Sequence, residues 1–148
     1  MKRMLIAAAA VLAVGTTAAF SQNAAVIGQR KEAMKAAGGA AKDGGAMMRG
    51  EAPFDLAKVQ AALKTYSDVA KRATAMFPDD SKTGGETTVL PVIWEKKAEF
   101  TAAMAKWDTD AAAAAGAIKD EASFKTEWPK VMANCGGCHK TYRVPPKQ

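Results

Sequence analysis

Three residues able to do chemistry stand close together near the C-terminus. Cys135, Cys138 and His139 form a C-x-x-C-H motif. This spacing is the attachment signature of a c-type haem, in which two thiols bond to the porphyrin and the histidine ligates the iron. On a helix, side chains three and four residues apart share one face, so all three would project to the same side of one turn. The motif predicts one haem c, covalently bound through both cysteines, with His139 as an iron ligand.

Two other kinds of site use the same residue types. In disulfide oxidoreductases the C-x-x-C pair accompanies a βαβ pattern, and this sequence shows no alternation of strand with helix. A tetrahedral zinc site takes four ligands, and the chain offers only two cysteines and one histidine. A carboxylate would have to complete such a site. Haem attachment is therefore favoured, with thiol redox chemistry second and zinc third.

The first 21 residues have the pattern of a secretory signal peptide. Lys2 and Arg3 give a charged start, residues 5–14 are apolar, and residues 19–21 fit a small-x-small cleavage site. The apolar run is too short to span a bilayer as a mature helix. We expect residues 1–21 to be removed. One domain, residues 22–148, then remains in the periplasm of a Gram-negative bacterium, with no membrane span.

Export and charge limit the kinds of partner. Two unmodified thiols outside the cytoplasm would tend to form a disulfide, which thioether bonds to haem would prevent. Loss of Lys2 and Arg3 lowers the formal net charge from +6 to +4. This mildly basic surface agrees with ordinary solubility or with weak steering toward an acidic redox partner. Nucleic acid is not expected as a partner, because no Lys/Arg cluster is interleaved with aromatic residues.

The elements that must position the motif are predicted from the apolar pattern. Apolar residues recur in helical steps of three and four over residues 23–50, 55–77, 90–118 and 120–142, and Asp55 fits an N-cap position. Four such segments without a strand pattern predict an all-α fold, an antiparallel four-helix bundle. The haem motif lies on the last of the four helices.

Three local features conflict with regular helices. Glycines at 38, 39, 44 and 45 interrupt the first helix, which is expected to bend or fray after Gly38 unless they allow close approach of a neighbouring group. Lys97 is the one charged residue on the apolar face of the third helix, where its stem could lie along the core. Pro129 predicts a kink or a late start in the fourth helix.

The mature chain resembles the class II cytochromes c, the group of cytochrome c′ and its low-spin c-556 relatives. The resembling segments are IGQRKEAMK at 27–35, RGEAPFD at 49–55, FP at 77–78, PVIW at 91–94 and CGGCHKTYR at 135–143. A C-x-x-C-H motif on the last of four helices is fairly specific to this group. The resemblance implies a single haem, with His139 as proximal ligand and the first helix across the opposite haem face.

The resemblance also implies roles for three further residues. Met34 would point at the iron from the distal side, where its thioether could be a sixth ligand; the alternatives are core packing and lining of the distal pocket. Arg30, one turn earlier, would lie at the haem propionates, the alternative being a solvated helix charge. Arg143 would lie beside the proximal imidazole, or stabilise the C-terminal dipole of its helix.

The function expected from this resemblance is electron transfer rather than enzymatic catalysis. In the favoured version the haem is low-spin and c-556-like, with iron held by His139 and Met34. The alternative is a five-coordinate, high-spin cytochrome c′ that binds NO or CO, with Met34 in the pocket wall. Redox proteins of the periplasm are the expected partners, and pairing of two copies through their first helices is a further expectation.

Overall fold

The computed structural model describes residues 2–83 and 85–145, with side chains described from Ala24 onward. Its long helices are α1 (Lys2–Met48), α2 (Leu56–Ala73), α4 (Lys97–Ala117) and α5 (Glu121–Tyr142), and its short ones are η1 (Thr74–Met76), η2 (Asp79–Ser81) and α3 (Val92–Glu95). The described ranges contain no β-strand, only an isolated antiparallel bridge between Val89 and Arg143. The all-α prediction is confirmed.

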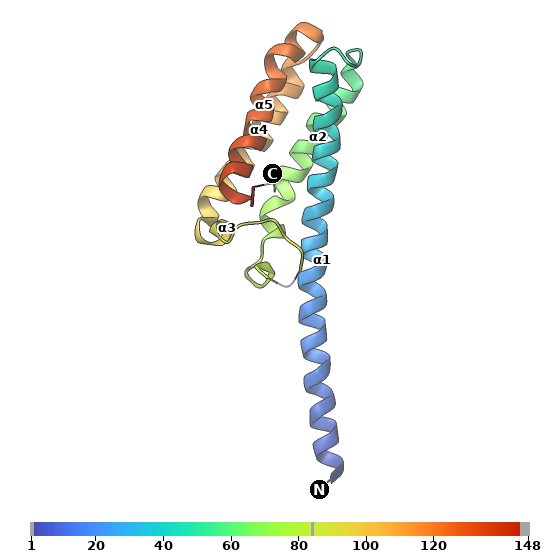
Figure 1. The fold of residues 1–148 in the computed structure, drawn as a ribbon, viewed down its shortest axis with the longest axis vertical. Coiled ribbons are helices and arrows are strands. Elements are labelled where there is room, and N and C mark those ends of the chain that lie inside the picture. Colours follow the sequence, from blue (N-terminus) through green and yellow to red (C-terminus); the bar gives the residue numbers. More distant parts are fainter. Residues whose placement is uncertain (1, 84, 146–148) are drawn as a thin grey trace.

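The four long helices run in alternating directions (Figure 1). Helix α2 packs against α1 and α4, and α5 packs against α4. Helices α1 and α5 meet where Gly44 lies against the indole of Trp128. The predicted antiparallel four-helix bundle is therefore confirmed.

The N-terminal part of α1 extends well past the other helices (Figure 1). The predicted signal peptide falls in this part, except for Met1, which lies outside the described residues, as do residues 146–148 of the predicted mature domain. In the ranges that the structure describes, no helix combines the length and the apolar character needed to cross a membrane.

Aromatic side chains form two groups in the core. The first joins α2, α4, α5 and the segment before α2, with ring centroids 5.3–5.7 Å apart between neighbours; its members are Phe54, Phe124, Trp128, Tyr66 and Trp107. The second has centroids 4.9–5.8 Å apart and comprises Trp94, Phe77, Phe100 and Tyr142. Such tilted and edge-on pairs stabilise beyond simple burial. Because Tyr142 follows His139 by three residues, the second group fixes the motif end of α5 against α4.

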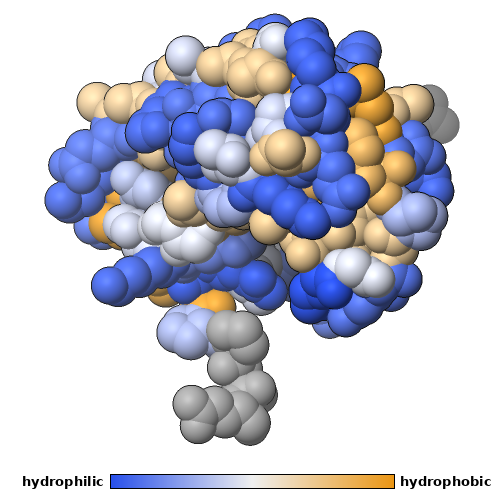
Figure 2. All heavy atoms as spheres, turned by 90° about the horizontal axis from the view of Figure 1, so that it is seen from above, coloured by the Kyte–Doolittle hydropathy of each residue, from blue (hydrophilic) through white to orange (hydrophobic). Residues whose placement is uncertain are grey.

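The surface is mostly hydrophilic. Figure 2 looks along the bundle and shows polar residues over most of this face, with apolar residues gathered in a band along one side. Many lysines pair with a carboxylate one helical turn away, as Lys64 does with Asp68 at 2.5 Å and Lys125 with Glu121 at 2.6 Å. Exposed pairs of this kind contribute only about 0–1 kcal/mol each. Their main effect is to keep the surface hydrophilic, and they add little to the stability of the fold.

Two helices begin at side-chain caps. Asp55 accepts a hydrogen bond from the backbone N–H of Lys58 at 3.0 Å, as predicted for an N-cap. At the start of α5, Asp120 accepts from the N–H of Ser123 at 2.8 Å, while Ser123 Oγ accepts from the N–H of Asp120 at 3.1 Å. This reciprocal pair is a capping box and fixes the register of the helix that carries the motif.

Replacing Asp120 with alanine is expected to lower the melting temperature at neutral pH, since the cap is lost. Hydrogen bonds from Ser123 hold the pKa of the Asp120 carboxyl below its usual value. A carboxyl with a lower pKa in the folded state stabilises the fold above its unfolded pKa, and this contribution disappears as the pH falls through the folded pKa. The difference between wild type and D120A should therefore shrink in acid. Glu86→Ala, at a residue with one exposed ion pair to Lys31, is the control; a D120A difference independent of pH would contradict the assignment.

The predicted helix irregularities need correction. Helix α1 does not fray after Gly38 but continues to Met48. The late start at Pro129 is wrong, because α5 begins at Glu121 and runs through the proline. Buried side chains on both sides of Pro129, at Trp128 and Val131, hold this region despite the roughly 3 kcal/mol that an interior proline costs.

The expected place of Lys97 along the core is also wrong. The helix breaks at Lys96, whose φ of −117° and ψ of 44° are not helical. Lys97 therefore starts a new helix, α4, and its side chain is exposed. The break moves Lys97 out of line with Ile93 and Phe100. Those two side chains are buried, whereas the side chain of Lys97 reaches solvent.

Candidate functional site

The three motif residues lie on the last two turns of α5. Cys135 and Cys138 are half-buried at the edge of the apolar core, and neither is in a disulfide. His139 follows directly and is exposed. One helix thus presents two thiols and an imidazole together, with the thiols against the core.

Burial sets the chemistry of these groups. It raises the pKa of the Cys135 thiol, and it raises that of Cys138 to about 11. Catalytic thiols of disulfide oxidoreductases have lowered pKa values, so this environment does not favour thiol redox chemistry. Partial desolvation of its ring, and next the positive charge of Arg143, lowers the pKa of His139. The lowered pKa favours the neutral imidazole, the form that ligates metals.

A zinc site finds no support in the geometry. Within residues 24–83 and 85–145, no three His, Cys, Asp or Glu side chains are grouped so that they could hold a metal ion. A structural zinc ion needs four such ligands. The zinc alternative therefore lacks its ligand set in the described part of the chain.

The segment before α3 lies along the end of α5. The N–H of Leu90 donates to the carbonyl of Tyr142 at 2.9 Å, and the N–H of Val144 donates to that of Thr88 at 2.7 Å. Arg143 ends the helix, and its N–H donates to the carbonyl of His139 at 3.2 Å. Sequence reasoning missed this pairing, because a bridge between residues more than 50 positions apart leaves no local pattern.

Met34 lies outside the packed core. Its side chain is 41% exposed, whereas Ala33 and Ala37 on the same helix are buried. The groove between α1 and α2 is lined on the α1 side by Asp43 and Met47. At 100° per residue, Met34 falls outside the arc of α1 that lines this groove. The alternative that Met34 fills the core is therefore wrong.

Arg30 is buried rather than solvated, being only 5% exposed. Its guanidinium carbon lies 4.4 Å from the ring centroid of Phe77 and 5.5 Å from that of Trp94. The side chain donates hydrogen bonds to the carbonyl of Met76 and to both the carbonyl and hydroxyl oxygens of Ser81. Nη1 is buried and has no partner among the described atoms. The alternative of a solvated helix charge is wrong.

The sequence-predicted residues thus form two groups. Cys135, Cys138, His139 and Arg143 lie at the end of α5, and Arg30 and Met34 lie one turn apart on α1. No hydrogen bond or ion pair joins side chains of the two groups within the described ranges. The donor set fits a covalently bound haem: two thiols and an imidazole on one helix face, a thioether on another helix, and a buried cation with an unpaired N–H for a carboxylate.

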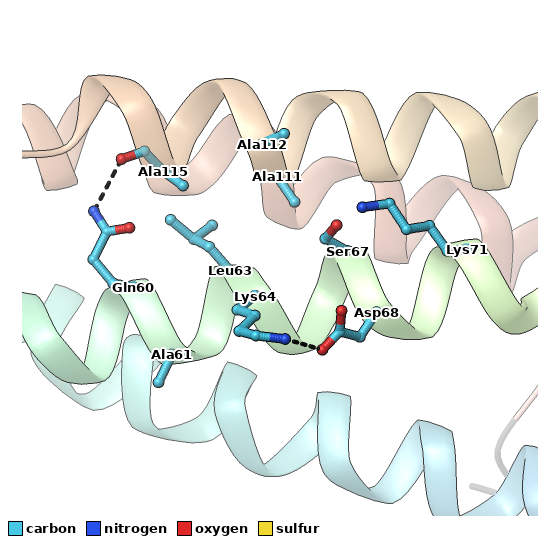
Figure 3. A pocket seen from close by; sticks show the side chains of 10 residues that line it. All are labelled: Gln60, Ala61, Leu63, Lys64, Ser67, Asp68, Lys71, Ala111, Ala112 and Ala115. Atoms are coloured by element: carbon cyan, nitrogen blue, oxygen red, sulfur yellow. Dashed lines mark hydrogen bonds and ion pairs between the residues drawn. The ribbon is translucent and has the colours of Figure 1, made fainter.

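A surface groove between α2 and α4 lies apart from both groups. It is lined by small residues such as Ala111 and Ala115 and by charged ones that pair across short distances, for example Lys64 with Asp68 (Figure 3). Gln60 donates to the carbonyl of Ala115 at 3.0 Å in the same groove. Its polar side chains pair with one another or with neighbouring groups such as Asp108, and it contains none of the predicted site residues.

Comparison with known proteins identifies the family of the chain. The family described as cytochrome c′ matches residues 25–143. The chain belongs to the cytochrome c′ family. A cytochrome c′ of Rhodopseudomonas palustris is 46% identical over 97% of this chain and 98% of its own length. A cytochrome c-556 of Agrobacterium fabrum is 41% identical over 78% of this chain and 79% of its own length.

Solved structures of the family share the fold. The structure titled cytochrome c′ from Rhodopseudomonas palustris superposes with a TM-score of 0.80 at 48% identity, covering 82% of this chain and 98% of that one. An NMR-validated structural model for oxidised cytochrome c556 of the same organism gives a TM-score of 0.75 at 29% identity, covering 82% of this chain and 98% of that one. Family and motif together assign haem c, held through Cys135 and Cys138, as the cofactor of this chain.

Proposed function

We propose that this protein is a monohaem cytochrome that carries electrons in the periplasm, with iron ligated by His139 and Met34. The observation that carries the proposal is the exposure of Met34, which lies on α1 one turn from buried Arg30. A large apolar side chain that takes no part in the core is available to bind the haem iron. A His/Met pair raises the haem potential and is typical of electron-transfer cytochromes.

Each residue of the site has a role in this proposal. The thiols of Cys135 and Cys138 fix the haem along α5, and the neutral imidazole of His139 supplies the proximal ligand. Arg30 offers its unpaired Nη1 to a propionate carboxylate, and Arg143 adds positive charge beside His139. When bound, haem supplies an iron that alternates between ferric and ferrous. The chain turns over no substrate, so we expect no enzymatic activity.

Location and partners follow from the same proposal. Residues 1–21 direct export to the periplasm, where haem attachment protects the two thiols from forming a disulfide. The formal charge of +4 on the mature chain favours an acidic redox partner. Pairing of two copies is also proposed, on the family resemblance alone.

A second candidate function is the binding of NO or CO at a five-coordinate, high-spin haem. It is favoured by the 46% identical relative, which is named cytochrome c′ rather than c-556. In this version His139 is the only protein ligand, and Met34 forms part of the distal wall.

Replacing Met34 with alanine distinguishes the two functions. If Met34 ligates iron, the variant changes from a low-spin to a high-spin absorption spectrum and gains CO binding, because the sixth position opens. Met48→Ala is the matched control, since Met48 lies two heptads later on the same flank of α1 and is half-buried. It should keep the wild-type spectrum. A wild-type protein that is already high-spin and binds CO would instead establish the second function.

A further inference from the structure

A buried polar network joins α1 to the turn after α2. Ser81, the last residue of η2, is fully buried. Its hydroxyl accepts a hydrogen bond from Arg30 and donates to the carbonyl of Pro78 at 2.7 Å. The indole N–H of Trp94 donates to the same carbonyl at 3.0 Å, so α3 is tied to this turn as well. Helices α1, η2 and α3 therefore meet at this network.

Among the described residues, the network leaves one nitrogen of the Arg30 guanidinium without a hydrogen-bond partner. Nε is taken by the carbonyl of Met76 and Nη2 by the two oxygens of Ser81, whereas Nη1 is buried without a partner. The rings of Phe77 and Trp94 lie against the planar group. Leaving a buried N–H of a charged group without an acceptor costs free energy. This orientation of Arg30 is therefore favourable only when an acceptor binds Nη1.

We infer that Ser81 is a positioning residue for Arg30, holding its guanidinium so that Nη1 faces a carboxylate of the bound haem. The inference rests on the proposed function, in which Arg30 meets a propionate. It adds a residue outside the haem motif that acts on the cofactor only through Arg30. The Ser81 hydroxyl accepts from Nη2 and thereby fixes the plane of the guanidinium, which leaves Nη1 as the donor to the carboxylate.

The test is the reduction potential of the purified holoprotein at one pH, measured against a redox buffer. Arg30→Gln removes the positive charge proposed to meet the propionate and so disfavours the ferrous form; we expect a shift of the ferric-to-ferrous ratio of about tenfold. Ser81→Ala should shift it in the same direction by about threefold, because the guanidinium is no longer held. In the Arg30→Gln background, Ser81→Ala should add nothing. Ser81→Thr, which keeps the hydroxyl, should retain the wild-type potential.

A matched control is Ser67→Ala. This substitution also removes a hydroxyl hydrogen bond, the one from Ser67 to Asp108 at 2.5 Å, but it lies on the α2–α4 side of the bundle. It should leave the potential unchanged. Urea unfolding of each variant, followed by circular dichroism, verifies that the chain is folded and gives a second readout: the effects of the Arg30 and Ser81 substitutions on the unfolding midpoint should be non-additive.

The outcomes separate the inference from the proposal on which it rests. If Arg30→Gln shifts the potential and Ser81→Ala does not, the positioning role of Ser81 is overturned and the role of Arg30 stands. If Ser81→Ala shifts the potential equally in both backgrounds, Ser81 acts independently of Arg30 and the inference also fails. If Arg30→Gln leaves the potential unchanged, Arg30 does not meet the haem. The propionate role of Arg30 and the positioning role of Ser81 are then both wrong.

Discussion

Replacing both Cys135 and Cys138 with alanine is expected to abolish covalent haem attachment. Acid-acetone extraction should then leave a colourless polypeptide, and the intact mass should equal that of the chain alone. The reason is that each thiol can form one thioether bond, and the chain has no third cysteine. The variant should also unfold at a lower temperature than the holoprotein, because a group that binds only the folded state stabilises that state.

Two controls define what the cysteine variant measures. Cys135→Ala alone should keep a single thioether, so part of the haem remains with the protein after extraction. Lys140→Ala changes the next residue after the motif, an exposed side chain, and should keep the full mass increase of bound haem. A double cysteine variant that still carried covalent haem would contradict the assigned attachment.

Replacing Gly44 with alanine is expected to destabilise the bundle by about 1–3 kcal/mol. A Cβ added at this position would come closer than 3.0 Å to several atoms of the Trp128 six-membered ring, so the indole or the backbone must move. Trp128 is itself buried and packs against Tyr66 and Phe124. Overpacking of a filled core typically costs about 1–3 kcal/mol, which exceeds the roughly 1 kcal/mol that alanine gains over glycine in helix propensity.

The same helix provides the control for this prediction. Gly38 and Gly39 are exposed, and a Cβ added at either would meet nothing within 4 Å. Gly38→Ala should therefore stabilise the protein by roughly 0.5–1 kcal/mol through helix propensity alone. Urea unfolding of both variants checks the pair. If Gly44→Ala proved as stabilising as Gly38→Ala, close packing of α1 on Trp128 would be contradicted.

The sequence was informative where the signal is local. The apolar steps of three and four predict the long helices, and the sequence predicts Asp55 as an N-cap because a cap depends on residues within one turn. The sequence also predicts the haem motif, because its three reactive groups lie within five residues. Local propensity failed where packing decides: Pro129 lies inside α5 because buried neighbours on both sides hold the helix.

The surroundings of the site were not predictable from local pattern. Burial of Arg30 depends on Ser81 and Trp94, which are about 50 and 64 positions away in the chain and share no sequence pattern with it. The exposure of Met34 was hidden for another reason. It lies one heptad after Ile27 on the same flank of α1, but Ile27 is buried where the loop at Gly85 lies against it, whereas Met34 is exposed. Only the tertiary arrangement distinguishes the two.

The most direct test of the central claim is the absorption spectrum of the purified wild-type protein, recorded oxidised and reduced and again after addition of CO. Ligation of iron by His139 and Met34 predicts a sharp low-spin reduced spectrum, a weak far-red sulfur-to-iron band in the ferric protein, and no change with CO. A broad high-spin spectrum without that band, shifting when CO is added, would contradict ligation by Met34 and leave His139 as the sole protein ligand.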